Sequence, residues 1–316
     1  MPYGSGKYTY ELVNDWAKLP KGASFLDIGG ISIDAQDRVY VLNRSTEHPV
    51  MVFDREGNFL TSWGQGLFKR AHGSGVGPDG SVYCTDDKNH TVRKFSPEGK
   101  VLMTLGNEDQ PSDTGYCEEY LDFFWSLNTI TRGGEPFNRP TGVSVTREGT
   151  IYVADGYGNA RIHKFSPDGK LLLSWGGPGY RPGEFRLPHD IFVDRQERVW
   201  VPDRENSRIQ IFDSNGKFLD QWENVLRPTD VYIDADGVVF VSELCQRFSI
   251  FSPDGELLAR WGTQPGATLE NAVFIAPHSV TLDSRGDIYV GEVAWTSYNR
   301  HIDRGANVLR KFVRKS

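Results

Sequence analysis

The sequence predicts an all-β fold, a six-bladed β-propeller in which each blade is a four-stranded antiparallel sheet. Three observations lead to this prediction. The 316-residue chain repeats with a period of about 40 residues. Each repeat holds short alternating apolar runs bounded by glycine-containing turns, and most repeats end in a tryptophan. Four-stranded units at this period are typical of propeller blades. Because repeat folds of this length often form one domain, residues 1–316 are expected to form a single propeller domain.

The repeats cover nearly the whole chain. Complete copies span residues 25–64, 68–106, 137–176, 185–222 and 225–262, and a further copy begins at residue 276 and runs to the end of the chain. In the third copy the first three strands are expected at 142–145, 150–154 and 161–165, and a Ser-Pro-Asp-Gly hairpin turn follows. The fourth strand of a repeat ends in tryptophan at Trp63, Trp175, Trp222 and Trp261.

The sixth copy is one strand short, because the chain ends soon after the apolar run at 308–313. The alternating segment 8–16 at the other end of the chain can supply the missing strand, and its Trp16 matches the tryptophans that end the other blades. We therefore expect the N-terminal strand to pair with the last blade and close the ring. Closure removes the open sheet edges that invite aggregation.

Composition narrows the functional classes. The formal net charge of −7 argues against a nucleic-acid partner, which needs clustered Lys and Arg. We find no apolar run long enough to span a membrane, and residues 1–10 are polar, unlike a secretory signal. The three cysteines are odd in number and widely spaced, so reduced thiols and a cytoplasmic location are expected.

Three histidines occupy one position in alternate repeats. His72, His189 and His278 each lie 11 residues before an aromatic residue of the second strand, and the repeats between them carry Gly29, Thr141 and Thr229 there. Alternate blades of a six-bladed ring would bring the three imidazoles to one axis. Three nitrogens with a fourth position open are typical of catalytic zinc. The competing interpretation is chance placement of ordinary structural or surface histidines, which is how we interpret His48, His90, His163 and His301.

The long loops are expected on the same face as these histidines. Because strands alternate in direction, the start of strand one and the end of strand two lie at the same side of a blade. The insertions 107–136, 263–275 and 294–307 fall on that side. Segment 107–136 holds Tyr116, Tyr120, Phe123, Phe124 and Trp125, and we expect it to form a lid over the channel mouth. A capping loop that only covers apolar surface is the alternative.

The repeats resemble the NHL type, and the histidine motifs resemble those of the peptidyl-α-hydroxyglycine α-amidating lyases. These motifs are Arg-Ala-His-Gly (70–73), Leu-Pro-His-Asp (187–190) and Ala-Pro-His-Ser (276–279). The resemblance implies a six-bladed propeller with a zinc ion held by the three histidines. The segment Asp-Gly-Tyr-Gly-Asn-Ala-Arg-Ile (155–162) resembles that of the family's catalytic tyrosine, which implies this role for Tyr157. The segments Asp-Arg-Glu-Asn-Ser-Arg-Ile-Gln (203–210) and Leu-Asn-Arg-Ser (42–45) likewise imply active-site arginines at Arg204 and Arg44.

This family cleaves the C–N bond of a carbinolamide to give an amide and glyoxylate. In such a reaction zinc would polarise the substrate hydroxyl, Tyr157 would take the hydroxyl proton, and Arg44 and Arg204 would bind the carboxylate. The sequence departs from the family at two places. Gly158 stands where secreted members have a disulfide cysteine, and Ser279 stands where the family has an acid that binds its structural calcium. The resemblance therefore implies zinc and leaves calcium open.

Two other functions remain open at this point. A metal-dependent hydrolase such as a lactonase would use the same fold, although six-bladed lactonases usually hold their metal with Asp, Glu and Asn. A non-catalytic NHL propeller would bind a peptide, a protein or RNA, and the acidic net charge disfavours RNA. The leading hypothesis is a zinc-dependent lyase that acts on a small-molecule carboxylate or hydroxy-amide.

Overall fold

The computed structural model describes residues 2–118, 123–264, 267–268, 271–297 and 302–315. Tyr120 and His301 therefore lie outside the described residues, and the expectations that concern them stay as predictions. Short strands dominate the described chain, and its α-helix is α1 (Phe123–Asn128). None of the helices in the described residues is long and apolar enough to cross a membrane.

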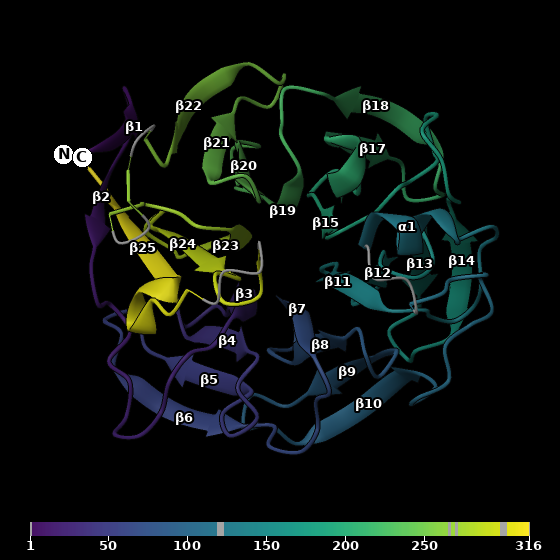
Figure 1. Cartoon of the computed structure of the whole chain (residues 1–316), viewed down its shortest axis with the longest axis horizontal. Coiled ribbons are helices and arrows are strands. Elements are labelled where there is room, and N and C mark those ends of the chain that lie inside the picture. Colours follow the sequence, from purple (N-terminus) through teal and green to yellow (C-terminus); the bar gives the residue numbers. More distant parts are fainter. Residues whose placement is uncertain (1, 119–122, 265–266, 269–270, 298–301, 316) are drawn as a thin grey trace. The chain divides into compact units, whose positions relative to one another are not determined.

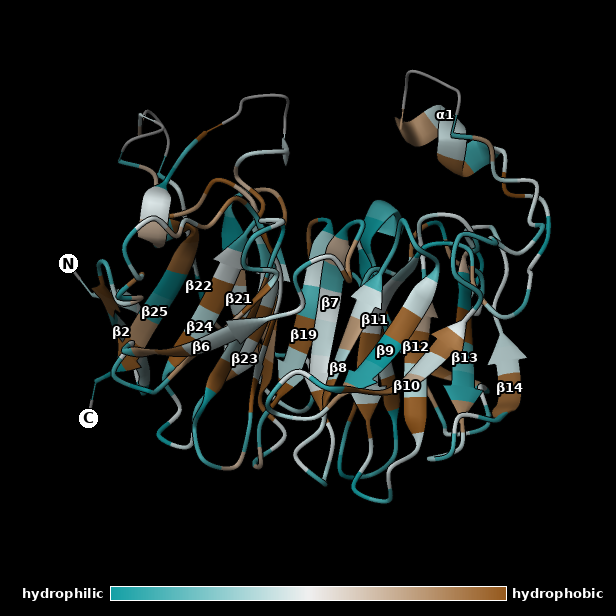
Figure 2. Cartoon of the chain, turned by 90° about the horizontal axis from the view of Figure 1, so that it is seen from below, coloured by the Kyte–Doolittle hydropathy of each residue, from teal (hydrophilic) through white to brown (hydrophobic). Residues whose placement is uncertain are grey.

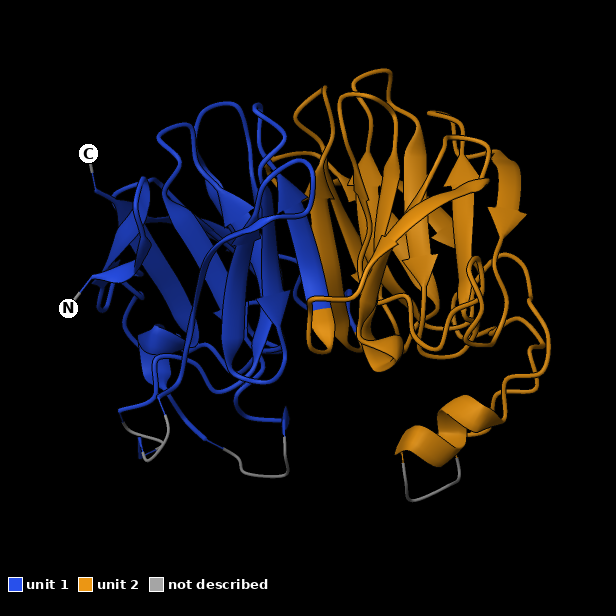
Figure 3. Ribbon diagram, turned by 90° about the horizontal axis from the view of Figure 1, so that it is seen from above, with its two compact units in different colours: residues 1–68, 229–316 blue, residues 69–228 orange. Residues whose placement is uncertain are grey.

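The strands form six antiparallel sheets, one for each predicted repeat, and the fold is the predicted six-bladed β-propeller (Figure 1). The chain divides into two compact units, which Figure 3 shows in different colours: unit 1 holds residues 1–68 and 229–316, and unit 2 holds residues 69–228. Each unit contains three of the six blades.

Unit 2 holds the second, third and fourth blades. The second consists of β7 (Ala71–Val76), β8 (Val82–Asp86), β9 (Thr91–Phe95) and β10 (Val101–Gly106). The third consists of β11 (Pro140–Val145), β12 (Ile151–Asp155), β13 (Arg161–Phe165) and β14 (Leu171–Trp175). The fourth consists of β15 (Phe192–Val193), β16 (Val199–Asp203), β17 (Arg208–Phe212) and β18 (Phe218–Trp222), with the short 3-10 helix η1 (Arg204–Asn206) after β16.

Unit 1 holds the first, fifth and sixth blades. The first consists of β3 (Ile28–Ile33), β4 (Val39–Asn43), β5 (Val50–Phe53) and β6 (Phe59–Trp63). The fifth consists of β19 (Pro228–Ile233), β20 (Val239–Glu243), β21 (Arg247–Phe251) and β22 (Leu257–Gly262). The sixth contains β23 (Pro277–Leu282), β24 (Ile288–Glu292) and β25 (Leu309–Arg314), which follows the 3-10 helix η3 (Gly305–Val308).

The chain's first strands complete the sixth blade, as predicted. Strand β2 (Tyr8–Val13) pairs antiparallel with β25, and β1 (Tyr3–Ser5) pairs with β2 as a fifth strand that the sequence did not suggest. The strand ends before the predicted limit at Trp16, because Asp15 has a positive φ of 52° that breaks the extended backbone. Trp16 still packs in the core, with its ring 5.1 Å from that of Tyr289.

The hydrophobic pattern explains this arrangement. In all six blades every residue of the second strand is buried, whereas the fourth strand of the first four blades is mostly exposed or half-buried, with Leu172 of β14 52% exposed. Bands of apolar residues accordingly run along the strands in Figure 2. Aromatic side chains fill the space between neighbouring blades. Trp175 of the third blade, for example, lies 6.0 Å from Phe212 of the fourth.

A buried polar side chain ends the second strand of every blade and fixes the side on which the candidate site lies. Asp86 accepts hydrogen bonds from the backbone N–H groups of Lys69 and Arg70 at 2.6 and 3.0 Å, and Asp203 accepts those of Arg186 and Leu187. These bonds join the end of strand two to the segment that leads into strand one. The equivalent residues elsewhere are Asn43, Asp155, Glu243 and Glu292.

Candidate metal centre

His72 lies at the start of β7 and is buried in unit 2. Its Nδ1 lies 2.7 Å from the carbonyl oxygen of Thr141, and a carbonyl can only accept, so Nδ1 carries the proton and donates it. In the neutral ring Nε2 is then unprotonated, and it lies 3.0 Å from the Tyr157 hydroxyl. Gly73 permits this approach, because a Cβ there would lie 2.3 Å from the same carbonyl oxygen. The local backbone thus selects the tautomer that metal-binding histidines use.

His189 also belongs to unit 2, three residues before β15, and its side chain is buried. Its backbone N–H donates to the carbonyl oxygen of Pro202 at 2.8 Å, which ties it to β16. The rings of His189 and His72 have centroids 4.9 Å apart, and the Tyr157 hydroxyl lies 3.4 Å from Nε2 of His189. One tyrosine therefore contacts two of the predicted metal ligands.

His278 lies in β23 of unit 1 and repeats the arrangement of His72. Its Nδ1 donates to the carbonyl oxygen of Gly29 at 2.9 Å, which leaves Nε2 unprotonated in the neutral ring. Gly29 and Thr141 are the residues that occupy the histidine position in the following repeats. In both cases, therefore, a repeat without a histidine orients the histidine of the repeat before it.

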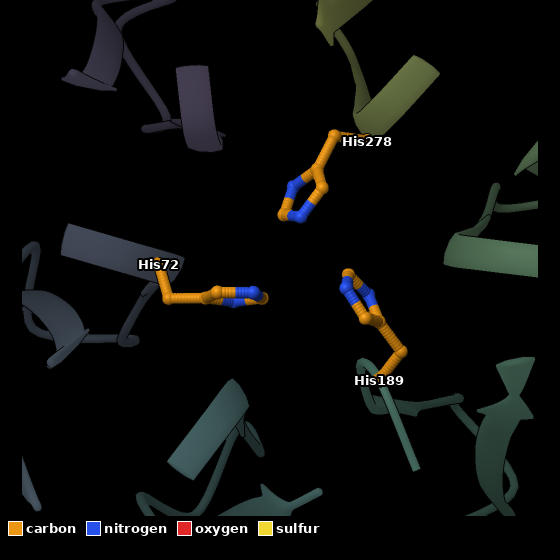
Figure 4. A group of neighbouring side chains, drawn as sticks. All are labelled: His72, His189 and His278. Atoms are coloured by element: carbon orange, nitrogen blue, oxygen red, sulfur yellow. The ribbon is translucent and has the colours of Figure 1, made fainter. Parts of the chain in front are cut away.

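The three predicted metal ligands form one group. One ligand atom from each of His72, His189 and His278 lies within 4.8 Å of the other two, and all three side chains are buried (Figure 4). Figure 4 shows the three imidazole rings pointing toward one another. Buried imidazoles that converge in this way suit a divalent metal such as zinc. The group could therefore hold a metal ion.

Tyr157 follows β12 and is surrounded by cationic side chains of unit 2. Its ring centroid lies 5.4 Å from the guanidinium carbon of Arg70, 5.1 Å from that of Arg139 and 5.6 Å from that of Arg204. The Tyr157 hydroxyl lies 3.5 Å from an Nη1 donor of Arg204. The predicted catalytic tyrosine and one of the two predicted arginines therefore lie together.

Arg204 is held in place by an acid next to it in the chain. Its Nε donates to Glu205 at 2.8 Å, and Glu205 also accepts from Nε and Nη2 of Arg227 at 3.1 and 2.7 Å. Burial acts to raise the pKa of Glu205, but the charge of Arg204 and the hydrogen bond from Arg227 outweigh it and hold the pKa below its usual value. Glu205 is thus an ionised anchor for the arginine beside Tyr157.

Sequence reasoning missed three charged residues beside Tyr157. Asp87 is fully buried and accepts hydrogen bonds from both Arg70 and Arg139, at 2.7 Å from Nε of Arg70 and 3.0 Å from Nη2 of Arg139. A signal was present, because Arg70 and Arg139 each lie two residues before the histidine position of their repeats. Asp87 lies 15 residues after its histidine, as Arg204 does.

The second predicted arginine belongs to unit 1. Arg44 follows β4, and its Nη1 lies 3.4 Å from the carboxylate of Asp27 and 3.2 Å from the Thr296 hydroxyl. Asp27 in turn accepts from the backbone N–H of Trp295 at 2.8 Å. Arg44 is therefore anchored by a buried acid, as Arg204 is, and its catalytic role stays a prediction.

The insertion 107–136 lies against the same group of unit 2. The Tyr116 hydroxyl accepts a hydrogen bond from Nη1 of Arg139 at 2.5 Å, and the ring of Phe123 in α1 lies 5.9 Å from that of Tyr157. The Thr114 hydroxyl donates to the carbonyl oxygen of Gly158 at 2.5 Å. Phe123 of the insertion thus contacts the candidate catalytic Tyr157, while a lid function remains a prediction.

The two departures from the lyase motifs have structural counterparts. A Cβ at Gly158 would lie 2.2 Å from the Asn138 side chain, so this backbone leaves no room for the family's cysteine. Ser279 is buried in β23, next to His278. Its hydroxyl is uncharged, so it does not supply the acidic calcium ligand that the resemblance would require, and a calcium site stays an open prediction.

The fold and these buried histidines define a six-bladed propeller with a candidate metal centre. The NHL repeat model matches residues 137–165 and 185–212, within the third and fourth blades. Human NHL repeat-containing protein 3 is 30% identical over 319 residues, an alignment that covers 94% of this chain and 85% of that protein. The chain therefore belongs to the NHL-repeat family.

The chain is also similar to an amidating lyase and to a lactonase structure. Peptidyl-alpha-hydroxyglycine alpha-amidating lyase 1 of Drosophila melanogaster is 36% identical over 183 residues, which is 54% of this chain and 30% of that protein. A gluconolactonase structure from Xanthomonas campestris superposes with a TM-score of 0.64 and 13% identity, covering 99% of this chain and 94% of that one. The second similarity shows the fold alone.

Proposed function

We propose that this protein is a metal-dependent lyase that cleaves the C–N bond of an N-acyl α-hydroxyglycine or a similar carbinolamide to an amide and glyoxylate. One observation carries the proposal: the Tyr157 hydroxyl lies 3.0 and 3.4 Å from Nε2 of His72 and of His189, and this proximity supports a proton-transfer role for Tyr157 beside the candidate metal ligands. The similarity to an amidating lyase supports the same reaction.

The residues fit a resident zinc ion. The donor set is three buried imidazoles, and the backbone carbonyls of Thr141 and Gly29 fix His72 and His278 in the tautomer that leaves Nε2 for a metal. A zinc ion bound there supplies Lewis-acid polarisation of the substrate hydroxyl. Among the described residues, the side chains that converge as potential metal ligands are these three histidines, and the group contains no acid of the kind typical of lactonases.

Tyr157 would move the proton. Its phenolate oxygen would take the proton of the substrate hydroxyl while the C–N electron pair leaves with the amide nitrogen. The carbinol carbon then becomes the aldehyde carbon of glyoxylate, and the proton passes to the departing nitrogen, so atoms and charge balance. Arg204, whose Nη1 lies 3.5 Å from the Tyr157 hydroxyl oxygen, would orient that oxygen toward the substrate.

Arg204 and Arg44 would bind the substrate carboxylate by charge-assisted hydrogen bonds. Each is already oriented by an acid, Glu205 or Asp27, so little side-chain entropy is lost when the carboxylate binds. The proposed partner is accordingly a small-molecule carboxylate or hydroxy-amide rather than nucleic acid or a membrane. The three cysteines are free thiols, which supports the proposed cytoplasmic location.

The test combines metal analysis with product formation. Protein purified without chelators is expected to retain about one zinc per chain, and to release glyoxylate from N-acetyl and N-benzoyl α-hydroxyglycine. Tyr157→Phe should keep the zinc and lower kcat by about 100-fold or more. A panel of lactones assayed in parallel tests the alternative hydrolase, which could retain activity without the phenol. Absence of glyoxylate with every hydroxyglycine derivative, from metal-replete protein, would overturn the lyase assignment.

A further inference from the structure

We propose that Phe123 of the insertion is a positioning residue that holds Arg204 for the substrate carboxylate. The inference rests on the proposed function and names a part of the site that belongs to this chain's own insertion. Phe123 would touch neither the metal nor the reacting atoms, and would act through the guanidinium group it contacts.

The guanidinium group of Arg204 lies against two aromatic rings. Its central carbon is 5.5 Å from the ring centroid of Phe123 and 5.6 Å from that of Tyr157. The two rings contact each other edge to face, with centroids 5.9 Å apart and an interplanar angle of 74°. Arg204 is only 5% exposed, so these contacts are formed in a largely desolvated setting, where cation–π attraction is strongest.

Hydrogen bonds fix one edge of the same guanidinium group. Nε donates to Glu205, and Nη1 faces the Tyr157 hydroxyl. Within the described residues Nη2 makes no hydrogen bond to protein, so it remains available to a carboxylate. Glu205 alone would allow the group to pivot about Nε, and the aromatic contacts oppose that rotation. Phe123 therefore helps to determine the direction in which Arg204 presents its donors.

Phe123 differs from the two aromatic residues that follow it. Phe124 is 45% exposed and lies near Arg227, 5.8 Å from its guanidinium carbon, and Trp125 is 65% exposed. Phe123 is half-buried and packs against the core cluster that contains Tyr157. Leu127, one helical turn later in α1, is buried in the same cluster and anchors the helix. The insertion thus directs one aromatic ring of three toward the arginine.

The experiment compares side chains that separate aromatic character from bulk. Phe123→Leu keeps an apolar side chain but removes the π face, whereas Phe123→Tyr keeps the π face. Trp125→Leu is the matched control on the same helix. Steady-state kinetics would be measured with N-benzoyl α-hydroxyglycine and with its methyl ester, which lacks the carboxylate.

Phe123→Leu is expected to raise KM for the acid by about fivefold to tenfold, with a much smaller change in kcat. The ester should show no such increase, Phe123→Tyr should stay near wild type, and Trp125→Leu should have no effect. The inference would be overturned if Phe123→Leu changed KM equally for the acid and the ester, or if Phe123→Tyr raised KM as much as Phe123→Leu does. Phe123 would then have only a packing role. If Phe123→Leu is unstable, Phe123→Met serves as a second variant without a π face.

Calorimetric titration of the zinc-loaded proteins with glyoxylate separates this inference from the proposed function. Suppose that the wild-type protein has no lyase activity but binds glyoxylate, and that Phe123→Leu binds glyoxylate more weakly. This result would refute the proposed reaction and support the positioning role. Lyase activity with a Kd and KM unchanged in Phe123→Leu would refute the positioning role alone. If the wild-type protein shows no lyase activity and does not bind glyoxylate, both proposals are overturned.

Discussion

The repeats with a histidine and the repeats without one form different hydrogen bonds at the position that His72, His189 and His278 share. His72 and His278 donate from Nδ1 to the backbone carbonyl of the residue that holds this position in the next repeat, Thr141 or Gly29. Thr141 and Thr229 instead donate their hydroxyl groups to the carbonyl oxygens of Pro188 and Pro277, each directly before a histidine, at 2.8 and 3.1 Å. The comparison teaches that the repeats between the candidate ligands help to orient them through residues that are not themselves candidate ligands.

The largest effect should come from removing a candidate ligand. We expect His189→Ala to lose most of its zinc and nearly all lyase activity, because two imidazoles no longer form the three-nitrogen set typical of catalytic zinc. Zinc content by mass spectrometry and glyoxylate release measure this. His48→Ala is the control, because His48 lies outside the repeated position and bonds to Ser62. Equal zinc loss in both variants would contradict the special role of the repeated position.

A smaller effect is expected at the glycine that lets His72 approach its acceptor. In Gly73→Ala the new Cβ would lie 2.3 Å from the Thr141 carbonyl oxygen, so the backbone must move. We expect a loss of about 2 kcal/mol in the free energy of unfolding, measured by urea denaturation, together with weaker zinc binding. The same change at Gly177, which has nothing within 4 Å of the added Cβ, should be close to neutral. Comparable losses in both variants would mean that the close approach does not matter.

Thr141→Val tests the orienting role of a repeat that has no histidine. The substitution keeps the β-branched shape and removes the hydroxyl that donates to Pro188 and Ala154. Leaving a buried acceptor unpaired should cost about 1.5 kcal/mol, and zinc affinity should fall about tenfold through the displaced His189. The exposed Thr104 of β10 provides the control. Unchanged zinc affinity in Thr141→Val would restrict this residue to a packing role.

The smallest effect concerns the acid that links the fourth blade to the segment before the fifth. The folded-state pKa of Glu205 is held below its usual 4.5, so its stabilisation is present above pH 4.5 and is lost as the pH falls through the folded-state value. Glu205→Gln should therefore be less stable than wild type by about 1 kcal/mol at pH 7, and the difference should shrink on acidification. Unfolding curves at several pH values measure it. The exposed Glu223→Gln should show no such trend, and a constant deficit in Glu205→Gln would argue against ionisation as its source.

The sequence predicted the parts of the fold that depend on periodic burial. Strand β13 lies at Arg161–Phe165, where alternation and the following turn placed it, and β2 completes the last blade because its pattern matches the missing strand. Periodicity failed at β15, which has only two residues. There Pro188 pairs with Asp203 only through an isolated bridge, so the ladder between the first two strands of this blade is interrupted before β15.

For the candidate site, the sequence revealed the residues that repeat and missed those that depend on packing. The three histidines share one register and could be predicted to converge. Arg70, Asp87 and Arg139 were not singled out, because arginine and aspartate are common near strand ends and only the folded chain shows which of them meet. The insertion has no periodicity, so its contact with Tyr157 through Phe123 depends on tertiary packing that no local pattern encodes.

The pairing of β2 with β25 has a practical consequence for handling this protein. Strands from the first and last residues of this sequence belong to one sheet, and hydrogen bonds rather than covalent bonds join β2 to β25. A purification tag fused to either end would lie close to the β2–β25 pairing. Deleting the first dozen residues would leave β25 as an unpaired edge strand that could pair with another molecule. With a fluorescent donor on one end and an acceptor on the other, a loss of energy transfer would report the separation of β2 from β25.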